Sequence, residues 1–584
     1  METTDSESKE ERPAPVTARW LEPAAVIVIV ALAIGLRFLG IEFGFPERVR
    51  PDEQYFVNAV RRFDSYNTLD PDWFYYPSLY MYINLAVWRG YALVQLLAGH
   101  YQPPQGLDRL RARSPDAEFL LGRCVTACFG VATVVIAYLL ARRFYGRKAA
   151  ATAAFLLAIN GLHTLNSHFY KSDVATTFFT VAALGCMARY VQDRRVGWNV
   201  GAAVCSGLAA STNYYGGFLL APLVVSQFMA LYRKENVAVE GQTWLSGLPA
   251  PGRAIARGMV RWETYAMPAI ALAVLAATSP YCFIRWKDFL DAFHRMLFAD
   301  RQSLYDTLVR VVQFDDYGFQ TSPLAYSLLF CWRYSTGLLL GVVSVVGLVF
   351  LAVRGKAVGR LLLLFFAVHF AMTASGKAVF MRYYLSLIPV MTIAAGALFS
   401  WTIQRRWPGD AAKQNLILAV ALIVCGFMSL WVSVRQDRLL ARKDTRVEAR
   451  EWLAANLPPS AVVGTPVDWW GNYYPYGKPT LPVGCTYVPV APEQVRAKGI
   501  RYVVVDESLL RLYSPPDRPQ WSAWLSTNAK LLFEVSPYPS PSPTGKPPVV
   551  SYDQLDAFYT PVAGFAAVTR PGPRIRLYEV SPAP

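Results

Sequence analysis

The sequence predicts a multi-spanning α-helical membrane protein, with about 11 spans, interfacial helices and a small C-terminal α/β domain outside the cytoplasm. Of its 584 residues, 54% are hydrophobic and only 17% are charged, and the mean hydropathy is +0.25. The apolar residues are concentrated in runs of about 17–22, the length that crosses roughly 30 Å of hydrocarbon. Beyond residue 440 these runs give way to short β-like segments. A soluble cytoplasmic enzyme and a disordered scaffold are therefore excluded.

The apolar runs and the basic clusters between them define the expected topology. The predicted spans are 21–41, 119–141, 149–166, 174–191, 197–212, 214–232, 264–283, 335–353, 361–376, 383–402 and 415–434. Clusters of lysine and arginine follow the runs that end at residues 141, 191, 232, 353 and 402. The positive-inside rule assigns these connections to the cytoplasm, which explains the net charge of +16 without a nucleic-acid partner. We therefore expect a cytoplasmic tail over 1–20 and a membrane domain over 21–434.

The apolar run 77–98 is interpreted as interfacial, because Arg89 lies near its middle among several aromatic residues. If this run crossed the membrane, the basic cluster at 142–148 would lie outside. Residues 42–118 then form one long outer loop with interfacial helices. The odd number of spans also puts 440–584 outside, as an extracytoplasmic α/β domain. In it we expect a helix over 447–456 and strands over 461–464, 501–505 and 576–580.

Three outer connections bring acids and bases to one side of the membrane. An Asp-Glu pair follows the first span, a second carboxylate opens the span at 174–191, and an Arg-Tyr pair precedes the span at 383–402. The residues singled out in these connections are Arg50, Asp52, Glu53, His168, Lys171, Asp173, Arg382 and Tyr383. Carboxylates and cations gathered beside lipid suit a sugar donor whose polyprenyl tail lies in the bilayer and whose phosphate lies among the headgroups. A carboxylate would take the proton of an acceptor hydroxyl, and cations would stabilise the departing phosphate.

Each of these residues also has a purely structural interpretation. Asp52 and Asp173 stand where first-turn acids stabilise a following helix, and Arg382 can reach toward the membrane interface. Outer arginines such as Arg50 often meet anionic lipid. Capping and catalysis are compatible, because a helix N-terminus holds a carboxylate rigidly.

The order of these motifs resembles the GT-C glycosyltransferases, and within them the family 39 branch of protein-O-mannosyltransferases and aminoarabinose-transferase-like enzymes. The resemblance rests on the Asp-Glu pair after the first span, the Asp that opens the fourth span, and Arg382-Tyr383 ahead of Pro389. The stretch from Tyr76 to Tyr80 resembles the interfacial Pro-x-x-Tyr segment of that branch. Residues 121–146 resemble its second span, which ends in Arg-Arg-Phe-x-Gly.

The resemblance implies a GT-C-like fold and a role for each site residue. Asp52 is implied to be the catalytic base, with Glu53 as its neighbour and Asp173 helping to shape the site. Lys171 and Arg382 are implied to hold the donor phosphate. His168, Tyr383 and Arg50 are further substrate-binding candidates, and His168 and Lys171 stand where many relatives carry an Arg.

The predicted function is therefore transfer of one sugar, with inversion, from a polyprenyl-phosphate donor to an acceptor hydroxyl at the outer face of the cytoplasmic membrane. The expected partners are this donor, membrane lipids and an acceptor that is a protein, a lipid or a glycan. No metal or other cofactor is indicated, because the sequence contains no metal-type cluster of Cys and His.

Three alternatives stay open at this stage. A transporter would carry ionisable groups at mid-span. A polysaccharide ligase or polymerase would use an oligosaccharide donor. An anchoring protein would serve only to present 440–584.

Overall fold

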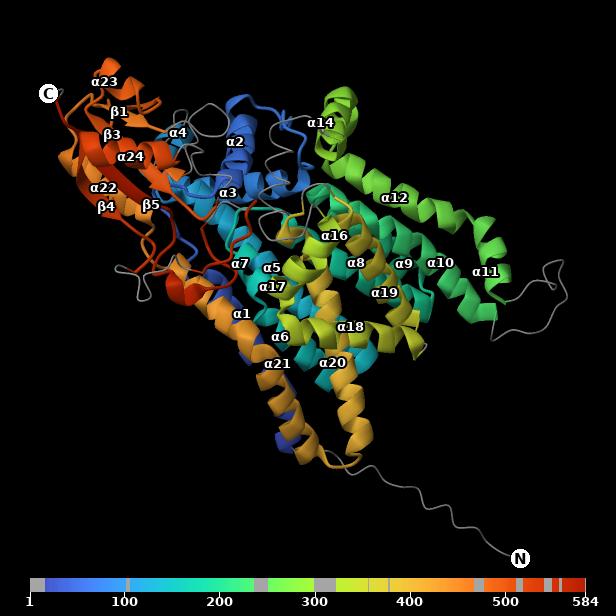
Figure 1. Ribbon diagram of the computed structural model, residues 1–584. Coiled ribbons are helices and arrows are strands. Elements are labelled where there is room, and N and C mark those ends of the chain that lie inside the picture. The colour runs from blue at the N-terminus through green and yellow to red at the C-terminus, as the bar shows by residue number, and fades with distance from the viewer. Residues whose placement is uncertain are drawn as a thin grey trace, which may run out of the picture.

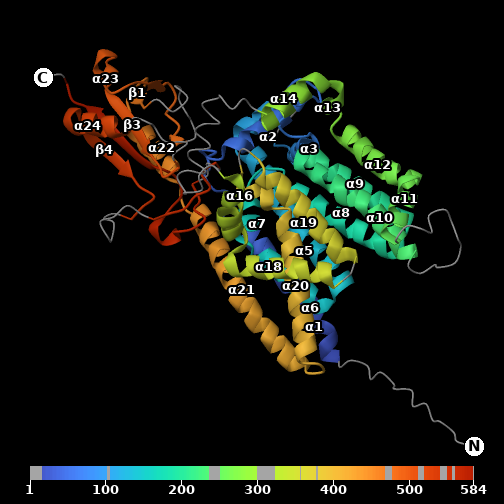
Figure 2. The same cartoon turned by 45° about the vertical axis from the view of Figure 1, so that its right-hand side comes forward.

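In the computed structural model, a bundle of helices carries a small β-sheet at one end (Figure 1). The structure describes residues 16–100, 106–235, 250–298, 322–354, 357–376, 379–466, 477–510, 518–539, 549–555 and 559–582. A turned view shows the same arrangement, with α21 (Ala411–Leu440) running from beneath the sheet along the bundle (Figure 2). The start of α1 (Val16–Phe38) lies at the end of the bundle away from the sheet.

Several helices have the length and apolar character of membrane spans, as in an integral membrane protein. Within the described residues six helices meet both criteria: Ala117–Tyr145, Asp173–Asp193, Tyr214–Tyr232, Ala357–Ala374, Leu387–Arg406 and Ala411–Asn456. They correspond to α5, α8, η1 (Tyr214–Leu219) with α10 (Leu220–Glu235), α19, α20, and α21 with α22 (Thr445–Asn456). A seventh is added if Pro323–Thr336 and Leu338–Val353, bent by 105°, are one span. Gly337, at φ +78°, forms that bend in a conformation that other residues rarely adopt.

The other expected spans are also helical, but several are short. These helices are α1, α6 (Arg147–Ala158) with α7 (Gly161–Asn166), α9 (Val196–Thr212), α12 (Trp262–Thr278) and α18 (Leu338–Val353). Helices α9 and α12 have 17 residues each and α18 has 16, at or below the lower limit of about 17 residues for a span. The count of eleven spans therefore stays a prediction.

Small residues let the helices of the bundle pack closely. A side chain added at Gly396 of α20 would come within 2.5 Å of the Ala149 carbonyl of α6. The same distance separates a side chain at Gly347 of α18 from the Ala394 carbonyl of α20. Close backbone approach through glycine and alanine is the usual means of helix association in a bilayer, where the surrounding lipid is as apolar as leucine.

The end of the bundle near the sheet carries helices from the segment that the sequence predicts to be the first outer loop. Helices α2 (Pro51–Ser65) and α3 (Leu79–Leu97) lie together there (Figure 1). Helix α3 covers the run interpreted above as interfacial, and it is not among the six span candidates. The remaining helical segments are α4 (Gly106–Arg113), α11 (Ala250–Met259), α13 (Tyr281–Ile284), α14 (Trp286–Phe298), α16 (Pro323–Tyr326), η3 (Ser327–Cys331), α17 (Trp332–Thr336) and η4 (Met381–Tyr384).

The C-terminal residues form a five-stranded sheet in the order β2-β1-β3-β5-β4. The strands are β1 (Val462–Thr465), β2 (Thr486–Pro489), β3 (Tyr502–Glu507), β4 (Ala529–Val535) and β5 (Arg574–Val580). Strand β1 is parallel to β2 and β3, and β5 is antiparallel to β3 and β4. Helices α22 (Thr445–Asn456), α23 (Gln494–Ala497), α24 (Arg518–Asn528) and η7 (Phe565–Ala567) accompany the sheet. A small C-terminal sheet is thus confirmed, and its extracytoplasmic side stays a prediction.

Candidate functional site

Asp52 is the centre of a cluster of charges from three segments far apart in the sequence. It lies in the first turn of α2, directly after Pro51, whose fixed φ favours this position in a helix. Its Oδ2 accepts a hydrogen bond from Lys171 Nζ and lies 3.8 Å from an Nη of Arg382. The Lys171 and Arg382 side chains are 2% and 6% exposed, whereas that of Asp52 is 35% exposed. The cations are therefore buried behind a carboxylate that is open to a substrate.

The surrounding charges keep Asp52 ionised. Burial would raise the pKa of this carboxyl, but the positive charges of Lys171, Arg382 and Arg50 and the hydrogen bond from Lys171 together hold it well below its usual range. Arg50, itself buried, lies with its guanidinium 4.3 Å from the centre of the Phe169 ring. The site thus carries several cations around one anion, an arrangement suited to a second anion.

Glu53, the neighbour of Asp52, is fully buried and has a different environment. It pairs with Arg123 of α5 through two hydrogen bonds, from Nε to Oε1 at 2.9 Å and from Nη2 to Oε2 at 2.7 Å. The backbone N–H of Tyr170 donates to the same Oε1 at 2.9 Å. Arg123 also donates to the carbonyls of Ile41 and Phe43, at 2.8 and 2.9 Å. Glu53 therefore ties α2, α5 and the 167–173 connection together behind Asp52.

The 167–173 connection presents Lys171 and His168 in different directions. Lys171 points to Asp52, as described above. The ring nitrogens of His168 lie 3.0 Å from the Thr164 carbonyl and 2.9 Å from the Leu39 carbonyl. Burial lowers the pKa of His168 to about 4, although the contacts with the two carbonyl oxygens favour the charged ring. In the described contacts His168 thus supports the fold of this connection and has no contact with Asp52.

Asp173 opens α8 and is also buried, at 1% exposed. Tyr215 of η1 donates its hydroxyl hydrogen bond to Asp173 Oδ1 at 3.3 Å. Asp173 Oδ2 has no hydrogen-bond partner among the described residues. Burial raises the pKa of Tyr76 well above its usual range, and of the nearby charges Arg382 opposes the shift while Asp173 and Asp52 add to it. Both carboxylates are thus close enough to Tyr76 to act on its pKa.

Arg382 and Tyr383 lie in η4, the short helix before α20. The Arg382 guanidinium is 3.9 Å from the centre of the Phe380 ring and 5.6 Å from that of Tyr383. The Tyr383 ring in turn lies 6.1 Å from that of Tyr215. Aromatic faces hold the guanidinium in place and leave its polar edge for Asp52 or a ligand.

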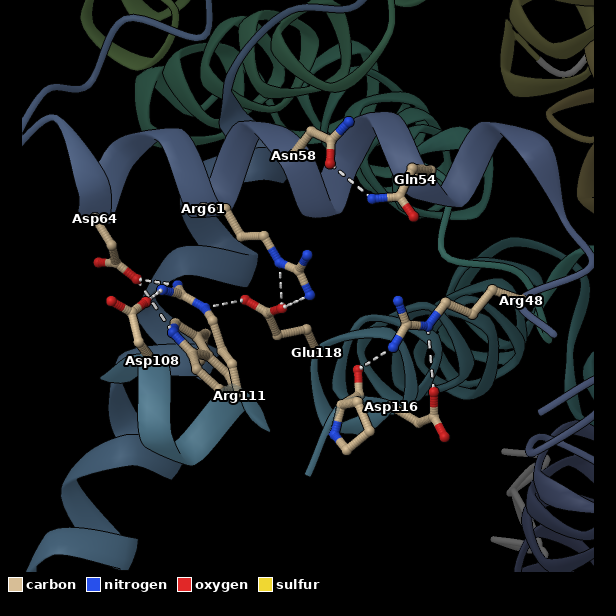
Figure 3. A network of polar contacts seen from close by, with 11 residues as sticks. Arg48, Gln54, Asn58, Arg61, Asp64, Asp108, Arg111, Asp116 and Glu118 are labelled. Atoms are coloured by element: carbon tan, nitrogen blue, oxygen red, sulfur yellow. Dashed lines mark hydrogen bonds and ion pairs between the residues drawn. The ribbon is translucent and has the colours of Figure 1, made fainter. Parts of the chain in front are cut away.

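A network of ion pairs fixes the outer face of α2 (Figure 3). Arg61 of α2 donates to Glu118 of α5 at 2.6 Å, and Arg111 of α4 donates to the same carboxylate at 2.9 Å. Arg111 also donates to Asp64 of α2 at 2.8 Å. Because Glu118 and Asp64 are only 4% exposed, this network is rigid compared with surface pairs. It holds the helix that carries Asp52 against α4 and α5.

The charged residues of the connections stand out in the sequence, whereas the residues that surround them, Arg123, Tyr215 and Tyr76, do not. Arg123 lies inside a predicted span, and a charged residue there is a signal for a buried partner. Tyr76 lies in the stretch that resembles the Pro-x-x-Tyr segment, but nothing in that pattern indicates its position beside Asp52 and Asp173. No group of three or more His, Cys, Asp or Glu in the described part of the chain is arranged to hold a metal ion.

Comparison with known families matches residues 77–246 to the family described as dolichyl-phosphate-mannose-protein mannosyltransferase. This part of the chain contains Lys171 and Asp173, whereas Asp52 and Arg382 lie outside it. The resemblance to the family 39 membrane glycosyltransferases is thereby confirmed over these residues. No curated protein matches the chain.

Solved structures of glycosyltransferases resemble the chain at low sequence identity. One is the oligosaccharyltransferase AglB from Archaeoglobus fulgidus in complex with an inhibitory peptide and a dolichol-phosphate, at 14% identity and a TM-score of 0.47, over 91% of this chain and 74% of that one. Another is ArnT from Cupriavidus metallidurans bound to undecaprenyl phosphate, at 14% identity and a TM-score of 0.43, over 97% of this chain and 98% of that one. A third is the S. cerevisiae protein O-mannosyltransferase Pmt1-Pmt2 complex bound to the sugar donor, at 16% identity and a TM-score of 0.33, over 48% of this chain and 35% of that one.

Proposed function

We propose that this protein transfers a single sugar from a polyprenyl-phosphate donor to an acceptor hydroxyl at the outer face of the cytoplasmic membrane. The observation that carries the proposal is the position of the Asp52 carboxylate between Lys171 and Arg382. One partly exposed carboxylate and buried cations are the groups that this transfer needs. The match of residues 77–246 to a family of lipid-phosphate-sugar transferases supports the same reaction class.

Asp52 acts as the general base in this proposal. The acceptor oxygen attacks the anomeric carbon, its proton passes to Asp52, and the bond between that carbon and the phosphate oxygen breaks with its electron pair leaving on the phosphate. Glu53 does not take this role, because Arg123 and the Tyr170 N–H already bind its two oxygens. A single displacement of this kind inverts the configuration of the sugar.

Lys171 and Arg382 hold the donor phosphate and receive its growing charge. In the free protein both cations act on Asp52 and keep its pKa low, so the carboxylate is ionised but a weak base. A phosphate bound beside them shares their hydrogen bonds and adds a negative charge near Asp52. Both effects raise the pKa of Asp52, and the donor thereby turns it into a stronger base.

Asp173 binds a substrate hydroxyl in this proposal. One of its oxygens accepts from Tyr215, and the other is buried without a partner among the described residues. A buried carboxylate oxygen without a donor is costly, and a sugar or acceptor hydroxyl supplies that donor when the substrate is bound.

The outer side of the membrane is proposed from the charge pattern of the connections. The basic clusters follow the runs that end at 141, 191, 232, 353 and 402, which the positive-inside rule assigns to the cytoplasm. The connections that carry Asp52, Lys171 and Arg382 are then extracytoplasmic. Polyprenyl-phosphate donors at this surface supply the sugar where nucleotide sugars are absent.

Purified protein in lipid nanodiscs, supplied with labelled polyprenyl-phosphate sugars, tests the proposal. We expect the label to pass to a hydroxyl acceptor and the Asp52→Asn variant to lose this transfer. A matched control is Asp116→Asn, which makes the same substitution at an aspartate that pairs with Arg48 at 3.3 Å and is not among the proposed site residues. Full transfer by Asp52→Asn contradicts the base assignment, and transfer only from oligosaccharide donors would identify a ligase or polymerase instead.

A further inference from the structure

The connection between β4 and β5 returns to the membrane domain and contacts one segment of the candidate site, while α22 contacts a second. The part of the connection that does so, residues 551–555 and 559–563, is called the docking segment here. Ser551 and Ala563 pair across it as an antiparallel bridge. Asp553 and Tyr559 are 4% and 2% exposed, and Val562 belongs to the same buried apolar cluster as Met381 and other residues of the helical bundle. Through Val562 the docking segment thus packs against the core of the helical bundle.

The first contact is made at the turn that carries Arg382. Asp553 Oδ2 accepts a hydrogen bond from the backbone N–H of Met381 at 3.2 Å. Met381 begins η4, and Arg382 is its second residue. The other oxygen of Asp553 accepts from the Leu555 N–H at 3.3 Å, which fixes the carboxylate on its own chain. Because the backbone of Met381 leads directly into Arg382, this bond orients the turn from which the guanidinium reaches Asp52.

The second contact is made at the start of α2. Arg446 of α22 is buried and pairs with Asp444 through Nε at 2.8 Å and Nη2 at 2.7 Å. Its third nitrogen, Nη1, donates to the Val49 carbonyl at 3.4 Å. The guanidinium lies 4.7 Å from the centre of the Tyr559 ring, so the docking segment supports this contact too. Val49 precedes Arg50 and the first turn of α2 with Asp52.

From these contacts we propose that Asp553 is a positioning residue for the donor-phosphate site, and that the C-terminal domain sets the distance between Arg382 and Asp52. The proposal rests on the proposed function only for the nature of the ligand. Both contacts end on backbone atoms next to a charged site residue: Met381 before Arg382, and Val49 before Arg50. A domain that served only as a tether would not need bonds at these two points.

Hydrogen exchange and phosphate binding on the full-length protein test this inference together. Asp553→Ala removes the acceptors for the Met381 and Leu555 N–H groups, whereas Asp553→Asn keeps one acceptor oxygen. We expect peptides covering 379–385 to exchange faster in Asp553→Ala than in the wild type, and undecaprenyl phosphate to bind about ten-fold more weakly, the equivalent of one charge-assisted hydrogen bond. Asp553→Asn, which keeps one of the two acceptors, should restore part of the exchange protection and part of the affinity. Glu579→Ala, which removes only the exposed pair with Arg501, should change neither.

The outcomes separate this inference from the proposed function. Wild-type exchange and wild-type affinity in Asp553→Ala would overturn it, as would an equal loss in Asp553→Asn. If the wild type fails to bind undecaprenyl phosphate, the proposed function fails, and the exchange at 379–385 alone decides the positioning role. If Asp553→Ala does not fold, Tyr559→Leu tests the second contact, because it removes the ring over the Arg446 guanidinium and keeps the Arg446–Asp444 pair; faster exchange is then expected over residues 47–53.

Discussion

Replacement of Glu53 by Gln should destabilise the protein more than replacement of its neighbour Asp52 by Asn. The two carboxylates are adjacent in sequence, but Glu53 is fully buried in a two-fold pair with Arg123, and Asp52 is 35% exposed. In Glu53→Gln the Arg123 guanidinium stays buried without a counter-charge. The side-chain amide also turns one N–H group toward a nitrogen that donates. The variant therefore removes the negative charge of a buried ion pair and leaves the positive charge of Arg123 buried.

The expected loss follows from the burial of this pair. Removing one partner of a buried, hydrogen-bonded ion pair costs about 3–5 kcal/mol in the free energy of unfolding. Arg123 keeps its bonds to the Ile41 and Phe43 carbonyls and its contact with the Phe43 ring, 3.8 Å from the ring centre. These remaining contacts favour the lower end of the range. Converted at no more than about 2 °C per kcal/mol for a long chain, the loss is about 6–10 °C at most in the apparent midpoint of thermal unfolding.

Thermal unfolding of the wild type, Glu53→Gln and Asp52→Asn in the same nanodiscs measures the difference. We expect a clearly lower midpoint for Glu53→Gln and a smaller decrease for Asp52→Asn, whose carboxylate is 35% exposed. The double variant Glu53→Met with Arg123→Met should regain part of the loss, since it leaves no buried charge unpaired. A wild-type midpoint in Glu53→Gln would refute the structural role given to Glu53, and with it the reason for choosing Asp52 as the base.

Three further predictions concern the reaction. Asp52→Asn should reduce transfer of a labelled sugar by about 10²–10⁴-fold, as expected for loss of a general base, while retaining binding of undecaprenyl phosphate by equilibrium titration. Because Asp52 must be ionised and its pKa is held low in the free protein, activity should fall as the pH drops through that pKa. The acid limb of the kcat/KM profile, which reports the free enzyme, should lie below the usual aspartate range, and the acid limb of the kcat profile, which reports the donor complex, should lie at higher pH. Coincident limbs would contradict the effect of the donor on the pKa of Asp52. Tyr215→Phe removes the donor to Asp173 Oδ1 and should change transfer rates more than the affinity for undecaprenyl phosphate, which a loss of binding alone would contradict.

The charged centre of the site could be predicted because membrane topology restricts where loops can be. Asp52, Lys171 and Arg382 come from three separate segments, yet the basic clusters assign all three connections to one side of the membrane. The charge pattern limits position along the membrane normal only. Which of the candidates then touch is decided by packing within the bundle, and His168 illustrates this, since its ring is directed at the carbonyls of Thr164 and Leu39.

The parts that the sequence did not reveal depend on partners rather than on local pattern. Strands β2 and β4 were not expected, and both lie at the edges of the sheet, where one side is unpaired and the alternation of buried and exposed residues is weak. Likewise, the residues next to Asp553 in the sequence do not distinguish it from other acidic residues after residue 440. Its importance is visible only once Met381 lies against it.

The pairing of Asp52 with Lys171 and Arg382 has a consequence for the order of events in the proposed reaction. Buried cations without a counter-ion are costly, and in the free protein the base itself supplies that counter-ion. A donor phosphate that enters takes over this role, and the carboxylate is then released to accept a proton. An acceptor that arrives first meets a carboxylate whose basicity is suppressed by the same cations. The one arrangement therefore stabilises the empty site and makes deprotonation of the acceptor depend on the donor.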